Sequence, residues 1–185
     1  MKYVKKFSFL FIALVFITLG TWLIFQAGIP GRADYTGSIV DNVGYVAPEI
    51  NNRAPSFSLN TVNSNEISLN DLFGKAVIIN FWATWCIPCR TEMPELQDLY
   101  DQFDGNIRIL GINQGENPQH VAQWMNDFKL TFDILLDPMR TVTQLYQIRG
   151  QPSTYVLDSN HVIRAIYYGP VSKEQLEQDI TAIQN

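Results

Sequence analysis

Cysteine and histidine are scarce in this sequence of 185 residues, which holds two of each. The cysteines, Cys86 and Cys89, are separated by only two residues, whereas a structural disulfide framework spreads its cysteines to close long loops. A structural zinc site usually takes four ligands, and His120 and His161 have no second ligand at a motif spacing. The sequence therefore predicts no disulfide framework, no metal site and no bound cofactor, and we expect both histidines at the surface.

Positive charge is also scarce outside the first few residues. After residue 52 there are nine Lys and Arg residues against fifteen Asp and Glu residues, and the basic ones are not clustered. Nucleic-acid-binding proteins usually present a basic patch that neutralises phosphate groups. This balance argues against nucleic acid as a partner, and the length suits a globular domain with one core.

The N-terminus carries the one long apolar run. Three lysines in the first six residues precede an uncharged stretch at residues 7–25 that is rich in Phe, Ile, Leu and Val. About 20 apolar residues are needed to cross the hydrocarbon core of a bilayer, and flanking lysines stay in the cytoplasm. We therefore expect a cytoplasmic tip at 1–6, a single-pass anchor in the cell membrane at 7–27, and an extracytoplasmic remainder.

A cleaved signal peptide is the alternative for this run. The apolar region of a signal peptide is typically about 7–15 residues long and is followed by an A-x-A-like cleavage site. The run here is longer, and the segment Gln26-Ala27-Gly28-Ile29-Pro30 after it has no such pattern. Both an anchor and a signal peptide would export the folded part, but only an anchor would keep it attached to the membrane.

Two parts follow the predicted anchor. Residues 28–52 are rich in Gly, Asn and Pro and lack helical periodicity, which predicts a linker that ends in a short docking strand. Residues 53–185 alternate short apolar strands with amphipathic helices, a pattern typical of an α/β domain with a central mixed sheet flanked by helices. The expected strands are 57–59, 66–69, 76–82, 107–112, 132–136, 154–157 and 162–168, and the expected helices are 86–103, 118–128, 140–146 and 172–183.

The two cysteines lie where a buried strand is expected to end and a helix to begin. A nearly continuous apolar run at 76–82 precedes Cys86, and helical spacing follows, with Pro94 as an expected kink. The free N–H groups and partial positive charge at a helix N-terminus stabilise a thiolate, which is the form that attacks a disulfide. Cys89, one turn further along, could then attack the mixed disulfide and release the product. A static disulfide or half of a zinc site is the alternative.

Around these cysteines the sequence resembles the thioredoxin active site, with Phe81-Trp82-Ala83, Trp85-Cys86 and Pro88-Cys89 matching its signature. Three further segments narrow the resemblance to the membrane-anchored TlpA/ResA-like group: Ala54-Pro55-x-Phe57-x-Leu59, Leu69-x-Asp71-Leu72-x-Gly74-Lys75 and Cys89-Arg90-x-Glu92-Met93-Pro94. The resemblance implies a thioredoxin fold with an N-terminal β-hairpin and a central inserted αβ element. It also implies an enzyme that keeps exported proteins reduced, often in cytochrome c maturation, and that is itself reduced by a membrane protein of the CcdA/DsbD type.

Residues 150–154, Gly-Gln-Pro-Ser-Thr, resemble the cis-proline loop of that family. X–Pro bonds are the only routine place for a cis peptide. The resemblance implies that Pro152 faces the cysteines and that the loop pairs with the substrate backbone. An ordinary turn before a strand is the alternative for this loop. The residues expected to dock the substrate are Trp85, Ile87, Pro88 and Gln151.

Asn80 and Glu92 are the other residues of interest, because thioredoxin has a buried Asp at the position of Asn80. An amide cannot take the proton of Cys89. Glu92 lies one turn beyond Cys89 on the same helical face and matches an acid of the TlpA/ResA-like group. Its carboxylate could accept that proton, and its charge would raise the pKa of the cysteines. The alternative is a solvated acid on the helix face.

The leading hypothesis is an extracytoplasmic thiol–disulfide oxidoreductase that reduces exported proteins through Cys86 and Cys89. A disulfide-forming oxidant would use the same pair, because the direction of exchange depends on the reduction potential. A thiol peroxidase is a further alternative, since peroxiredoxins share the Ala-Pro-x-Phe-x-Leu opening. Their signature places Thr three residues before the reactive Cys, however, and this chain has Ala83 there.

Overall fold

The computed structural model describes Thr18, Leu19 and residues 45–184. Within those residues, no helix is both long and apolar enough to span a bilayer. The predicted anchor at 7–27 lies outside the described residues apart from Thr18 and Leu19, and the predicted linker at 28–52 lies outside them up to residue 44. The described residues from Tyr45 onward belong to one compact unit.

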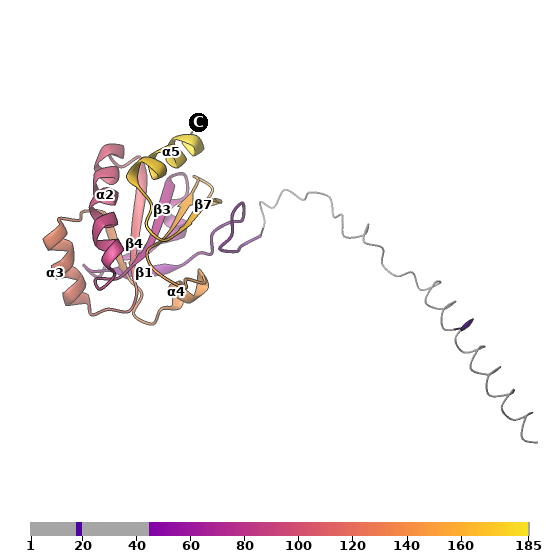
Figure 1. The fold of residues 1–185 in the computed structure, drawn as a ribbon, viewed down its shortest axis with the longest axis horizontal. Helices are drawn as coiled ribbons and strands as arrows, with labels where there is room; N and C mark the ends of the chain where they lie inside the picture. The colour runs from indigo at the N-terminus through magenta and orange to yellow at the C-terminus, as the bar shows by residue number, and fades with distance from the viewer. Residues whose placement is uncertain (1–17, 20–44, 185) are drawn as a thin grey trace, which may run out of the picture. The chain divides into compact units, whose positions relative to one another are not determined.

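A mixed sheet of seven strands forms the centre of this unit, in the order β2-β1-β5-β4-β3-β6-β7. β3 pairs in parallel with β4 on one side and antiparallel with β6 on the other. β5 is parallel to β4, and the hairpin of β1 and β2 is added antiparallel to β5. Figure 1 labels β1, β3, β4 and β7 of this sheet. The strands are β1 (Ser58–Thr61), β2 (Glu66–Ser68), β3 (Ala76–Trp82), β4 (Ile107–Asn113), β5 (Asp133–Leu136), β6 (Ser153–Leu157) and β7 (Ile163–Tyr168).

Helices cover both faces of the sheet, and β3 shows how. Successive side chains of a strand point to opposite faces. Ile78 and Trp82 pack in a core cluster with α2, α3 and α5, whereas Val77, Ile79 and Phe81 pack in a second cluster with η2 and α4. All seven β3 residues are buried, which explains an apolar run without alternation. The helices are η2 (Leu69–Leu72), α2 (Ile87–Phe103), α3 (Pro118–Phe128), α4 (Thr141–Leu145) and α5 (Lys173–Gln184).

The predicted strands and helices are confirmed, and their ends differ from prediction by at most two residues. Capping explains two of the differences. Arg140 has a left-handed φ of 56° and precedes α4 as its N-cap. The Ser172 hydroxyl accepts the N–H of Gln175 at 3.3 Å, as expected for an N-cap of α5. The predicted hairpin and the inserted α3–β5 element are also present, with β5 between β4 and β1.

The segment before β1 lies along the edge strand β7. The N–H of Asn51 donates to the C=O of Ile163 at 2.8 Å, and the N–H of Ile163 donates to the C=O of Asn52 at 2.9 Å. The predicted docking strand is replaced by two isolated bridges at Arg53, one to Val46 and one to Val162. The end of the predicted linker is therefore hydrogen-bonded to the domain from Asn51 onward.

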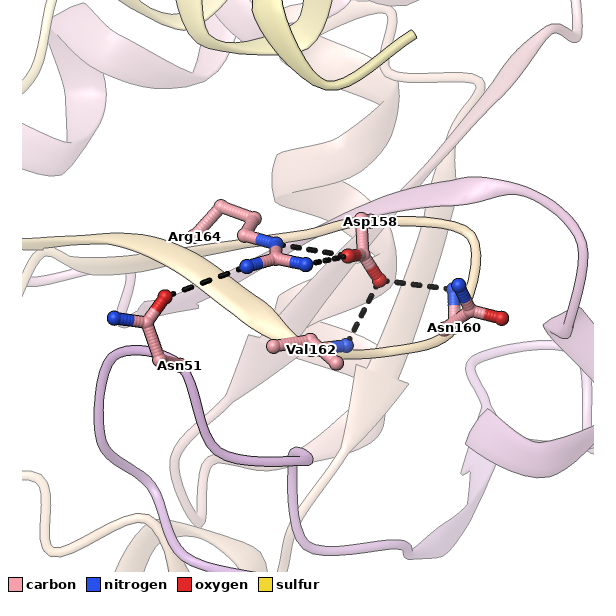
Figure 2. A network of polar contacts seen from close by, with 5 residues as sticks. All are labelled: Asn51, Asp158, Asn160, Val162 and Arg164. Atoms are coloured by element: carbon pink, nitrogen blue, oxygen red, sulfur yellow. Dashed lines mark hydrogen bonds and ion pairs between the residues drawn. The ribbon is translucent and has the colours of Figure 1, made fainter. Parts of the chain in front are cut away.

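A polar network holds this contact in place, as Figure 2 shows. Asp158, in the turn between β6 and β7, accepts the N–H groups of Asn160 and Val162 at 2.9 and 3.0 Å. Its other oxygen accepts Arg164 Nε at 2.8 Å, and Arg164 donates in turn to Asn51 Oδ1 at 3.3 Å. One buried carboxylate thus ties the β6–β7 turn to the segment that enters the domain.

His161 contradicts the expectation that both histidines lie at the surface. His120 is exposed, but His161 is 1% exposed in the β6–β7 turn, where its ring stacks on Phe73 at 4.2 Å between centroids. Burial lowers the pKa of His161, because the charged imidazolium is the form that loses hydration. In the part of the chain that the structure describes, no group of three or more His, Cys, Asp or Glu side chains could hold a metal ion.

Candidate active site

Cys86 and Cys89 form a disulfide at the start of α2. Cys86 is the N-cap of the helix, and its Sγ accepts the backbone N–H of Cys89 at 3.2 Å. Cys89 has no exposed surface, whereas Cys86 keeps a small exposed area between the exposed side chains of Trp85 and Ile87. A substrate can therefore approach Cys86 and not Cys89.

The turn before α2 fixes the position of Cys86. β3 ends at Trp82, and the C=O of Ala83 accepts the N–H of Cys86 at 3.2 Å. Pro88 lies in the first helical turn, where its missing N–H leaves no helical hydrogen bond unmade. Cys86 consequently lies where free N–H groups and the helix dipole favour a thiolate.

The cis-proline loop lies beside this turn because of the sheet register. β6 pairs with β3 so that Ser153 is opposite Phe81, which places Pro152 at the carboxyl end of β3. The Gln151–Pro152 peptide bond is cis, as predicted, and the alternative of an ordinary turn is wrong. Pro152 is buried, and Gln151 is half-buried.

The predicted docking residues lie in two segments, with Trp85, Ile87 and Pro88 around Cys86 in the chain and Gln151 in the proline loop. Trp85 and Ile87 are 68% and 78% exposed, and Pro88 is exposed beside them. A pocket of about 660 Å³ adjoins Gln151 and Pro152. Neither cysteine lines this pocket, and neither do Trp85, Ile87 and Pro88. Exposed apolar side chains are a feature of surfaces that bind a partner. The structure thus brings the predicted catalytic pair, the proline loop and the docking residues to one end of the sheet.

Glu92 is 2% exposed, so the alternative of a solvated surface acid is wrong. Its Oε2 accepts Asn80 Nδ2 at 2.9 Å, and its Oε1 accepts the N–H of Val171 at 3.1 Å. Burial raises the pKa of Glu92 to about 7, although both hydrogen bonds oppose the rise. A carboxyl group with this pKa can take or give a proton near neutral pH.

Asn80 connects Glu92 to the sheet. It is fully buried on β3 and donates both to Glu92 and to Thr154 Oγ1, each at 2.9 Å. Asn80 and Thr154 are opposite each other in the β3–β6 register. The carboxyl group one turn behind the disulfide is therefore held by β3, by the segment before α5 and, through Asn80, by β6.

Glu116 is a residue of the site that the sequence analysis did not single out. It follows β4, and its carboxylate accepts Thr84 N–H at 2.7 Å, Thr84 Oγ1 at 2.5 Å and Asn113 Nδ2 at 2.6 Å. Thr84 is two residues before Cys86. The sequence feature that could have pointed to Glu116 is the polar segment directly after the apolar strand at 107–112. Residues that follow parallel strands gather at one edge of the sheet, so this segment could have been expected near the cysteines.

Comparisons with known proteins show the family to which this chain is similar. The AhpC/TSA family model matches residues 50–166. Thioredoxin-like protein YneN of Bacillus subtilis is 36% identical over 131 residues, which are 69% of this chain and 76% of the relative. Thiol-disulfide oxidoreductase ResA of Geobacillus kaustophilus is 34% identical over 162 residues, which are 87% of this chain and 91% of the relative.

A solved structure is similar over the same domain. The crystal structure of a thiol:disulfide interchange protein of the thioredoxin family from Chlorobium tepidum has a TM-score of 0.66 and 28% sequence identity. The match covers 72% of this chain and 96% of that one. This likeness confirms the predicted thioredoxin fold with its mixed sheet and flanking helices.

The buried carboxyl group of Glu92 makes stability depend on pH. Its pKa of about 7 in the folded state lies above the ordinary 4.5, so its contribution to stability is present below pH 4.5 and is lost as the pH rises to 7. Glu92→Gln is neutral throughout and should not show this loss. We expect the free energy of unfolding of the wild type, relative to Glu92→Gln, to fall by roughly 3 kcal/mol between pH 4.5 and 7.5.

Urea denaturation with the disulfide intact measures this difference. Glu66→Gln, at an exposed residue of β2, controls for the removal of one surface charge. A difference between wild type and Glu92→Gln that stays constant with pH would contradict the raised pKa.

Proposed function

We propose, from the premise that this chain belongs to the AhpC/TSA family and is a thiol–disulfide oxidoreductase, that it reduces disulfides of exported proteins outside the cytoplasm. The observation that carries the proposal is the asymmetry of the cysteine pair. Cys86 lies at a helix N-terminus between exposed apolar side chains, and Cys89 is buried one turn behind it. Such a pair can attack a protein disulfide with one sulfur and resolve the intermediate with the other.

The reaction begins with the reduced pair. The Cys86 thiolate attacks one sulfur of the client disulfide, the client S–S bond breaks, and the departing client sulfur takes a proton from solvent. Cys89 gives its proton to Glu92 and attacks Cys86 Sγ, which breaks the mixed disulfide and releases the second client sulfur as a thiolate. This thiolate takes a proton from solvent. Two electrons have then passed to the client, and the enzyme is left with the Cys86–Cys89 disulfide seen in the structure.

The buried acid supports the reducing direction. A low thiol pKa stabilises the reduced form and makes an oxidant, whereas a carboxylate near the thiols opposes thiolate formation. Glu92 lies buried one turn beyond Cys89, where its ionised form has this effect. The alternative of a disulfide-forming oxidant uses the same two sulfurs and differs in reduction potential.

The location is proposed from the sequence. The lysine-flanked apolar run at 7–27 would keep the domain at the outer face of the cell membrane. The chain has no second cysteine pair, so its electrons must come from another protein, for which a membrane thiol donor of the CcdA/DsbD type is suited. Apocytochrome c, with its Cys-x-x-Cys-His segment, is the client class that the resemblance suggests.

The roles of the cysteines can be tested by trapping. Cys89→Ser should accumulate a mixed disulfide with an oxidised Cys-x-x-Cys-His peptide, because Cys86 can attack but nothing resolves the adduct. Cys86→Ser should trap nothing, since Cys89 is buried. Mass spectrometry under non-reducing conditions measures the adduct, and a stronger adduct in Cys86→Ser than in Cys89→Ser would reverse the assignment.

The direction of electron flow can be tested by redox equilibration. We expect a reduction potential for the Cys86–Cys89 couple nearer to about −270 mV, as in thioredoxin, than to about −120 mV, as in DsbA. Equilibration with glutathione or dithiothreitol buffers, followed by thiol labelling, gives the value. A potential above about −180 mV would favour the oxidant.

The location can be tested by labelling intact cells. In a variant with both cysteines changed to Ser, Met139→Cys introduces a thiol at a side chain that is 77% exposed. A membrane-impermeant maleimide should label it in intact cells, whereas Lys2→Cys should be labelled only after lysis. Labelling of Met139→Cys only after lysis would show that the proposed topology is wrong.

A further inference from the structure

Glu116 lies where β4 ends, next to the turn that carries Cys86. β3 and β4 are parallel with Trp82 opposite Asn113, so the segments that follow the two strands run side by side. The N–H of Gln114 donates to the C=O of Trp82 at 3.3 Å and joins these segments. Gly115 follows with a left-handed φ of 78°, and the N–H of Glu116 donates back to Asn113 Oδ1 at 3.3 Å.

Three donors hold the carboxylate of Glu116. Its Oε2 accepts Thr84 N–H at 2.7 Å and Asn113 Nδ2 at 2.6 Å, and its Oε1 accepts the Thr84 hydroxyl at 2.5 Å. These distances are in the short range expected for hydrogen bonds to an ionised acceptor. The two ion pairs within the described residues involve other acids, so no cation there neutralises Glu116.

We propose that Glu116 is a positioning residue for the attacking thiol and acts through Thr84. The backbone N–H and the hydroxyl of Thr84 both bind this one carboxylate, and Thr84 is two residues before Cys86. The restraint involves neither sulfur, so it persists when the disulfide opens and the link between Cys86 and Cys89 is lost. A thiolate that is already held in position attacks faster than one that must first be ordered.

The charge of Glu116 has a second, separable effect. A carboxylate fixed beside the N-terminal turn of α2 opposes the helix dipole and raises the pKa of the Cys86 thiol. The other charged side chains close to the cysteines in the chain are the buried Glu92 and the exposed Arg90. This part of the inference rests on the proposed function, because a raised thiol pKa favours the reducing direction.

Two substitutions separate position from charge. Glu116→Asp keeps the charge but shortens the reach to Thr84, and Glu116→Gln keeps the length but removes the charge. We expect both to slow the reaction of the reduced enzyme with dithiobis(nitrobenzoate) by roughly tenfold, after correction for the fraction of Cys86 that is thiolate. Only Glu116→Gln should lower the Cys86 pKa, by about 0.5–1 unit.

Two substitutions of Thr84 form a matched pair of variants that differ in the side-chain hydroxyl. Thr84→Val removes the hydroxyl and keeps the side-chain shape, so it should slow the corrected rate, whereas Thr84→Ser keeps the hydroxyl and should stay close to the wild type. Glu66→Gln, on the strand at the far edge of the sheet, controls for the loss of one charge. Circular dichroism establishes that each variant is folded.

The proposal is overturned if folded Glu116→Asp and Glu116→Gln react at the wild-type corrected rate, even where their stability is reduced, because Glu116 would then have only a structural role. An unchanged Cys86 pKa in Glu116→Gln would overturn the effect of its charge. The reaction with dithiobis(nitrobenzoate) requires no client protein, and its rate does not depend on the direction of electron flow between the enzyme and a client. An oxidising wild-type potential would therefore overturn the proposed function, while the corrected rates would still decide the role of Glu116.

Discussion

Strand β3 is paired along both edges and covered on both faces, and the positions of the groups in the site follow from its register. A shift of one residue would exchange its two faces, moving Ile78, Asn80 and Trp82 away from α2. Burial on both sides forbids that exchange, because each face fills a separate apolar cluster. The turn with Cys86 therefore leaves the sheet between the loop of Pro152, beside β6, and the turn of Glu116, after β4.

Burial of the Glu92 carboxyl group next to Asn80 is a part of this arrangement that opposes folding. Hydrogen bonds to a charged group contribute about 1.5–3 kcal/mol each, whereas removing a carboxylate from water costs several kcal/mol. Two such bonds leave the pKa of Glu92 at about 7, so they do not offset the burial. An apolar side chain of similar size would avoid this cost. Stability alone does not explain an acid at this position, and the proposed proton exchange with Cys89 would give it a use.

Local patterns were sufficient to predict most of the fold and the chemical core of the site. The apolar run of β3, the helical spacing after Cys86 and the motif around Pro152 are each contained in a few consecutive residues. The failures depend on contacts between distant segments. Glu116, which the sequence analysis missed, binds Thr84 across 32 residues. The burial of Glu92, which the sequence left open, depends on a hydrogen bond from a segment 79 residues away. His161 is buried because Phe73 stacks on it. Periodicity within one segment contains no information about which other segment will cover it.

Glu92 and Glu116 also bear on the balance between the reactivity of Cys86 and the reduction potential of the cysteine pair. The helix N-terminus increases the fraction of Cys86 present as thiolate, but a thiolate of low pKa is an intrinsically weaker nucleophile. Attack is fastest when the thiol pKa is close to the ambient pH. In the roles proposed for them, the carboxylates of Glu92 and Glu116 would oppose the helix dipole and raise that pKa, which would strengthen each thiolate as a nucleophile and destabilise the reduced form relative to the disulfide. The same two groups would thus make Cys86 reactive near neutral pH and make the pair a reductant.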